Sequence, residues 1–151
     1  MTRTRTIRLA LTLTLLGVLT LGATATAAAG GQKIFESSMA GLTTPGQVID
    51  GVTAAGAPWS IDEGKAILFA NGRLHVEVEG LIVTALGRNP ATTGKAVVSC
   101  NGVVAATTAA VPFSSTGDAE VDAFVSLLSP CFGPSVFFTS AGGSWFAATG
   151  F

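Results

Sequence analysis

The sequence has few of the side chains on which enzymes depend. It holds no Tyr, one His and two Cys, and charged residues make up 11% of its 151 residues. It contains neither a C-x-x-C redox motif nor a Cys/His zinc set, because His75 is its one imidazole. It also lacks a G-x-S-x-G nucleophile elbow. The absence of these motifs predicts a protein that has neither a set of catalytic residues nor a cofactor.

Long apolar runs are equally scarce, apart from one near the start. Arg3, Arg5 and Arg8 precede an uncharged apolar run of thirteen residues, Leu9 to Leu21. A membrane span needs about 20 apolar residues, whereas a secretory signal peptide needs fewer. The pattern therefore predicts a cleaved signal peptide, and the alternative is an uncleaved N-terminal anchor.

Small residues follow the apolar run, and they offer overlapping cleavage sites after Ala25, Ala27 or Ala29. We expect residues 1–29 to be the signal peptide and residues 30–151 to form one mature domain, which is secreted, extracellular or attached to the cell envelope. No second apolar run suggests an integral membrane segment in the mature chain.

Basic residues are few in the expected mature chain. Loss of the three signal arginines leaves five basic side chains against nine acidic ones, a net charge of −4. Nucleic-acid binding requires a basic surface, so this class of function is excluded. Binding to an anionic membrane by charge is disfavoured for the same reason.

The two cysteines, Cys100 and Cys131, predict one disulfide, because an even pair in a small secreted domain is normally oxidised. The alternative is a pair of buried free thiols.

Strand and turn signals dominate what remains. Asn71-Gly72 and Asn101-Gly102 each separate two apolar segments, as expected of hairpins with type I′ turns. From 73 to 79, apolar and polar residues alternate with a period of two. We further expect strands over 33–42 and 47–52, and a third hairpin whose Gly-rich loop is 140–144.

These signals predict an all-β fold, an antiparallel β-sandwich of about eight or nine short strands that is Ig-like or chordin-domain-like. Two patterns overlap in the segment Ala119–Leu128. Alternation favours a strand, but a helical stripe with Asp118 as its N-cap also fits, formed by Val121, Phe124, Val125 and Leu128.

Candidate ligand residues lie on two of the expected strands. Alternation places His75 and Glu77 on one polar face, where they could bind a metal or carry a proton. Asp118, Glu120 and Asp122 would share a face if 119–127 is a strand, which suggests a calcium site or a solvated acidic surface.

The aromatic residues admit two interpretations. Trp59 and Trp145, with nine Phe, either fill the core or line a binding surface. We favour the core for both indoles.

The run from Trp59 to Leu81, with its G-K-A-I-L-F-A-N-G-R-L-H-V-E-V-E-G-L sequence, resembles an uncharacterised family of small secreted bacterial β-sandwich proteins. The similarity continues to the closing Trp145-Phe146-Ala147, and it implies no catalytic residues. The spacing of glycines and alternating apolar residues in this run is distantly similar to that of the chordin-type domain. This chain lacks the histidine pair that those domains carry after that strand, so the similarity implies a fold and no metal site.

We therefore expect a non-catalytic secreted β-sandwich that binds an extracellular protein or glycan, or that serves as a structural component of the envelope. The alternative is a small secreted hydrolase or metal-dependent enzyme that uses His75 with nearby carboxylates.

Overall fold

The computed structural model describes residues 31–127 and 130–150, which form β-strands and turns but no helix. The predicted all-β class is confirmed. The predicted signal peptide, residues 1–29, lies outside the described residues. Within the described part, no helix is long and apolar enough to cross a membrane.

The described residues form thirteen strands, and eight of these have five residues or more. The longer strands are β1 (Lys33–Gly41), β5 (Glu63–Phe69), β6 (Arg73–Glu79), β8 (Thr93–Cys100), β9 (Val103–Thr107), β11 (Ala119–Phe124), β12 (Ser135–Ser140) and β13 (Trp145–Thr149). The two-residue strands are β2 (Val48–Ile49), β3 (Val52–Thr53), β4 (Trp59–Ser60), β7 (Ile82–Val83) and β10 (Val111–Pro112).

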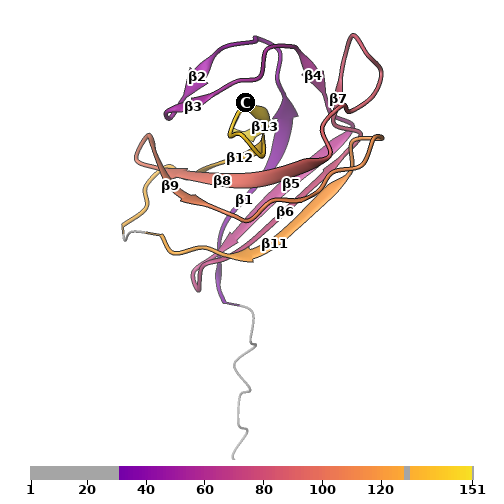
Figure 1. The fold of residues 1–151 in the computed structure, drawn as a ribbon. Helices are drawn as coiled ribbons and strands as arrows, with labels where there is room; N and C mark the ends of the chain where they lie inside the picture. Colours follow the sequence, from indigo (N-terminus) through magenta and orange to yellow (C-terminus); the bar gives the residue numbers. More distant parts are fainter. Residues whose placement is uncertain (1–30, 128–129, 151) are drawn as a thin grey trace, which may run out of the picture.

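One nine-stranded antiparallel sheet dominates the molecule. Its order is β10-β8-β12-β13-β1-β5-β6-β11, and β9 also pairs with β8. β1 joins the two halves of the sheet, because residues 33–38 pair with β5 and residues 39–41 pair with β13. The sheet curls into a half-barrel (Figure 1), which is compatible with the predicted sandwich.

The core lies inside the curl and draws residues from both halves. On β6 the apolar Leu74, Val76 and Val78 are buried, whereas His75 and Glu77 between them face outward. Burial of each Leu or Val side chain stabilises the fold by about 1.5 to 3 kcal/mol. The predicted period of two on this strand is therefore confirmed, and it orients the polar face discussed below.

Trp59 and Trp145 are both buried, as predicted. The Trp59 ring stacks on Phe146 with centroids 4.0 Å apart, and Phe113 extends the aromatic cluster at 6.3 Å from Trp59. Stacked aromatic pairs of this kind add to the stability that burial alone supplies.

The two hairpins predicted at Asn-Gly have different turns. Asn101 and Gly102 both have positive φ, 57° and 77°, and they join the paired residues Cys100 and Val103 as a type I′ turn requires. The first hairpin, β5–β6, is also present, but its predicted type I′ turn is wrong. There Gly72 alone has a positive φ, and its N–H bonds to the Phe69 carbonyl, which lengthens the loop.

The single strand expected over 47–52 is also wrong. Asp50 and Gly51 adopt φ of 50° and 80° and fold the segment into a tight hairpin between β2 and β3. Asp-Gly favours this turn for the same steric reason as Asn-Gly.

The segment after Asp118 is a strand, so the helical alternative for it is excluded over its described residues. β11 ends at Phe124, earlier than the predicted Leu127. Its pairing with β6 is regular throughout, and Asp122 lies directly opposite His75.

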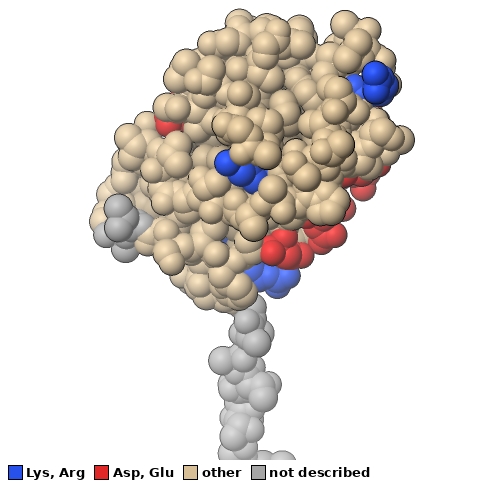
Figure 2. Space-filling view, viewed as in Figure 1, with Lys and Arg blue, Asp and Glu red and all other residues tan. Residues whose placement is uncertain are grey.

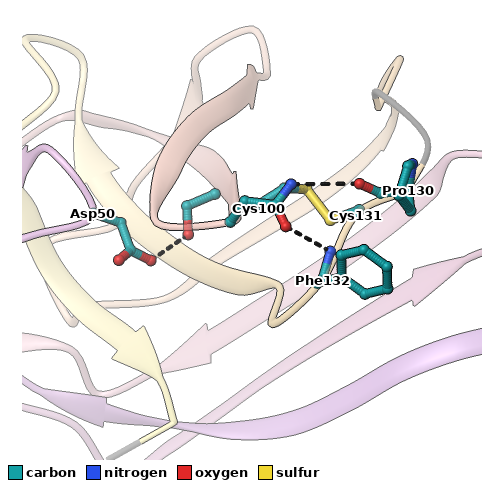
Figure 3. Close-up of a disulfide and its surroundings, with 7 residues drawn as sticks. Asp50, Cys100, Pro130, Cys131 and Phe132 are labelled. Carbon is teal, nitrogen blue, oxygen red and sulfur yellow. Dashed lines mark hydrogen bonds between the residues drawn. A yellow bond between two sulfur atoms is a disulfide. The ribbon is translucent and has the colours of Figure 1, made fainter.

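Cys100 and Cys131 form the predicted disulfide, with Cα atoms 5.0 Å apart. It ties the end of β8 to the segment before β12, as Figure 3 shows. The side chain of Asn101 reinforces the link, because it donates to the Pro130 carbonyl at 3.4 Å and accepts from the Phe132 N–H at 3.3 Å.

Candidate functional site

The outward surface of β5, β6 and β11 carries most of the carboxylates on this part of the sheet. We call it the acidic face, and it comprises Glu63, Glu77, Glu79, Glu120 and Asp122. Figure 2 shows acidic side chains gathered along the edge formed by these strands, while most of the visible surface is uncharged.

Strand register places like charges opposite each other on this face. Glu63 pairs with Glu79 across β5 and β6, and Glu77 pairs with Glu120 across β6 and β11. Like charges directly opposite on neighbouring strands destabilise a sheet. The face therefore has an excess of negative charge that the fold itself does not require.

The nearest cations on β1 and β5 are already paired. Both Lys33 and Lys65 bind the carboxylate of Glu36, with the Lys65 Nζ to Glu36 Oε1 distance at 2.6 Å. The hydrogen bonds from Lys33 and Lys65 lower the pKa of Glu36 from 4.5 to about 2. The same contact raises the pKa of Lys65. Lys65 lies opposite Glu77, but its ammonium is bound to Glu36.

His75 lies at the centre of a group of carboxylates. Its Nδ1 is 3.4 Å from Asp122 Oδ1 and 3.8 Å from Glu120 Oε1. Its Nε2 is 3.9 Å from Glu77 Oε2 on the other side of the ring. The strands bring four of the five predicted ligand residues together in this way.

Arg73 also contacts this group, through a hydrogen bond of 3.1 Å from its Nη2 to Asp122 Oδ1. Burial opposes ionisation of Asp122, but the Arg73 hydrogen bond and the charge of His75 outweigh it and lower its pKa. The ionised form of Asp122 is therefore the one that the site stabilises.

Asp118, the fifth predicted ligand residue, lies apart and has a structural role. It accepts hydrogen bonds from the hydroxyls of Thr116 and Ser114 and from the N–H of Gly80, at 2.6, 3.0 and 3.1 Å. The Thr116 and Gly80 bonds lower its pKa. These contacts fix the turn before β11 and engage both carboxylate oxygens of Asp118, which lines the same hollow as Glu77 and Glu120.

The surroundings of His75 are open. A shallow hollow of about 270 Å³ borders the group, lined by residues of β6, of β11 and of the turn before β11 that include Glu77, Asp118 and Glu120 but not His75. Within residues 31–127 and 130–150, no Ser or Thr hydroxyl is hydrogen-bonded to the imidazole. The arrangement can bind a cation or hold a proton.

Sequence reasoning missed Arg73 as a member of the group. Its place follows from the pairing of Arg73 with Phe124, which brings its guanidinium within reach of Asp122. The alternation of side chains along the strand predicts that Arg73 and His75 share a face, and this pattern could have placed Arg73 in the group.

Comparison with protein-family models, with curated proteins and with solved structures finds no match to this chain. The resemblance to a secreted bacterial family therefore stays a prediction.

Proposed function

We propose that this protein is a secreted, non-catalytic binding module whose acidic face binds a positively charged segment of an extracellular protein. The observation that carries the proposal is the opposition of Glu63 to Glu79 and of Glu77 to Glu120. A surface of one sign attracts and orients a partner of the opposite sign.

Secretion is supported by two features. The charged, apolar and small-residue segments of 1–29 follow the order of a signal peptide. The disulfide between Cys100 and Cys131 is a bond that persists in oxidising compartments.

Repulsion within the acidic face supports a role in binding. Each opposed pair of glutamates costs stability in the free protein, and a cationic partner would relieve that cost on binding. Lys33 and Lys65 bind Glu36 and Arg73 binds Asp122, so among the described residues Glu63, Glu79 and Glu120 make no salt bridge to a lysine or arginine and can act in this way.

A protein partner is favoured over a glycan. Trp59 and Trp145 are both buried and the chain has no Tyr, so the exposed rings in the described part of the chain are those of Phe124 and Phe132, which have no polar group to offer a sugar. The surface therefore offers charge together with the apolar ring of Phe124, which is 75% exposed at the end of β11.

The enzymatic alternative is supported by one distance, the 3.4 Å between His75 Nδ1 and Asp122 Oδ1. A hydrolase would need in addition a concave pocket around that pair and a positioned nucleophile or water. The open sheet surface around His75 favours binding over catalysis.

The test is a titration of a ten-lysine peptide into the mature protein at low and at moderate salt, followed by calorimetry. We expect saturable binding that weakens as salt rises. The E63Q/E77Q/E79Q variant should lose this binding, whereas E63D/E77D/E79D, which keeps the charges, should retain it. Equal binding by the Gln and Asp variants would overturn the proposal.

A further inference from the structure

We propose that His75, Glu120 and Asp122 form a binding site for a divalent transition metal ion such as Zn²⁺. Their ligand atoms, one imidazole nitrogen and two carboxylate oxygens, all lie within 4.8 Å of one another. Glu120 and Asp122 belong to the acidic face, but the metal site does not depend on the binding of a basic partner, because these three side chains supply all its protein ligands.

The spacing of the three ligand atoms fits a small ion. Zinc–ligand bonds of roughly 2.0 to 2.1 Å place the ligands of a tetrahedral site about 3.3 Å apart. The Nδ1 of His75 is already 3.4 Å from Asp122 Oδ1. The 3.8 Å to Glu120 Oε1 closes with a small rotation, because the Glu120 side chain is 61% exposed and free to move.

The backbone positions these ligands on a rigid support. β6 and β11 are hydrogen-bonded neighbours, with His75 directly opposite Asp122 and Glu77 directly opposite Glu120. Glu120 and Asp122 are two residues apart on one strand, so both side chains project from the same face as His75. A site built on paired strands holds its ligands without the ordering cost of a loop.

Glu77 orients the imidazole for metal binding. Its Oε2 lies 3.9 Å from His75 Nε2, on the opposite side of the ring from the other carboxylates. When a metal ion occupies Nδ1, the proton of the imidazole lies on Nε2, where Glu77 can accept it after a small rotation of its side chain. Glu77 is thus a positioning residue and not a ligand.

The donor set selects the class of metal. Imidazole suits Zn²⁺, Cu²⁺ and Ni²⁺, whereas Ca²⁺ takes six to eight oxygen ligands. Three protein ligands leave positions for water, and the carboxylates of Glu120 and Asp122 are 61% and 46% exposed. We therefore expect one exchangeable transition-metal ion and no comparable affinity for calcium.

Arg73 competes with the metal ion for Asp122, so replacement of Arg73 tests the proposal. Its Nη2 donates to Asp122 Oδ1 at 3.1 Å, the oxygen that also faces His75. A metal ion must share or displace this guanidinium, whose positive charge repels it. Removal of Arg73 should therefore strengthen metal binding. Adsorption to surface carboxylates alone is distinguished by H75A, which removes the imidazole and keeps every carboxylate.

The experiment is calorimetric titration of ZnCl₂ into metal-stripped mature protein. We expect one saturable site in the wild type, its loss in H75A and in D122N, and affinity about five-fold higher in R73A because a cation beside the site is gone. E63Q, which removes a carboxylate of the same face outside the site, should bind as the wild type does.

Circular dichroism of each variant shows whether the fold is kept, and D122N serves if H75A fails to fold. Absence of saturable binding in the wild type, or equal affinity in wild type and the folded H75A or D122N variant, overturns the proposal. So does R73A binding no more tightly than wild type. The E63Q/E77Q/E79Q peptide experiment keeps all three ligands, so failure of the basic-partner proposal can be distinguished from failure of this one.

Discussion

Gly72 shows at the residue scale how one position restricts the choice of side chain. Its φ is 84°, and a Cβ there would overlap the carbonyl oxygen of Val125, whose N–H bonds to the Gly72 carbonyl at 2.8 Å. The first hairpin therefore needs glycine both for its backbone conformation and for the close approach of the chain after β11.

Gly72→Ala should lower the free energy of unfolding by more than Gly87→Ala. Gly87 also has a positive φ, 62°, but a Cβ there would meet nothing within 4 Å. The control should cost only the backbone term, about 1 to 2 kcal/mol, and Gly72→Ala should add the displacement of Val125. Urea unfolding of both variants measures the difference, and equal losses would contradict the account.

The pKa of Glu36 gives a second prediction at the residue scale. Its pKa is about 2 in the folded protein against an ordinary value of 4.5. A carboxyl whose pKa falls on folding stabilises the fold above its unfolded pKa, and that contribution is lost as pH falls from about 4.5 to about 2. NMR titration of the Glu36 carboxyl should give a midpoint near 2.

The K33A/K65A variant should bring the Glu36 midpoint back toward 4.5, because both ammonium groups that lower the pKa are gone. An unchanged midpoint in that variant would show that the two lysines are not the cause.

Among the elements, the β5–β6 pair tests the repulsion inferred for the acidic face. Glu79→Lys places opposite charges at the Glu63–Glu79 pair, which should raise the free energy of unfolding by about 0.2 to 1 kcal/mol. The gain should shrink at high salt, where charges on the surface are screened. Thermal unfolding at two salt concentrations checks this, and a loss of stability at low salt would refute the repulsion.

The link between β8 and the segment before β12 depends on the disulfide. Cys100→Ser/Cys131→Ser should cost about 3 to 4 kcal/mol, because the bridge closes a loop of 31 residues in the unfolded chain. Mass spectrometry should find the native protein two hydrogens lighter than its reduced form. Denaturant unfolding without a loss in the variant would mean that the bridge does not stabilise the fold.

How much the sequence predicts also differs between elements. Strand β6 is predicted because its apolar residues alternate, and the Asn101 turn because Asn-Gly adopts positive φ readily. The turn at Asn71 is not predicted, because its conformation depends on the contact of Gly72 with Val125, a residue outside the hairpin. The candidate site is predicted only as residue types. Which carboxylate faces His75 depends on the register of β11 against β6, a long-range pairing that no local pattern encodes.

At the scale of the whole molecule, β1 ties the two halves of the sheet into one unit. Residues 33–38 of this strand pair with β5 and residues 39–41 with β13, and one core fills the curl between the halves. Neither half can lose its pairing with β1 without exposing that core.

The domain should therefore unfold in one cooperative step. Fluorescence of Trp59 and Trp145 and far-ultraviolet circular dichroism should give coincident denaturation curves, since both indoles lie in the shared core. Two separate transitions would mean that the halves are independent and that β1 does not couple them.

The charge distribution is also a property of the whole molecule. The acidic face occupies one side of the half-barrel, over β5, β6 and β11, whereas Asp50 lies on the β2–β3 hairpin, where it accepts a hydrogen bond from Ser99 at 2.6 Å. A partner attracted by charge should therefore approach from one side.

NMR mapping of a ten-lysine peptide on the ¹⁵N-labelled mature protein tests this most directly. We predict that shifted amide signals will cluster on β5, β6 and β11 and will disappear in E63Q/E77Q/E79Q. Shifts spread over the β8, β12 and β13 half of the sheet, or no shifts at peptide concentrations that saturate other acidic binding modules, would contradict a binding role for the acidic face.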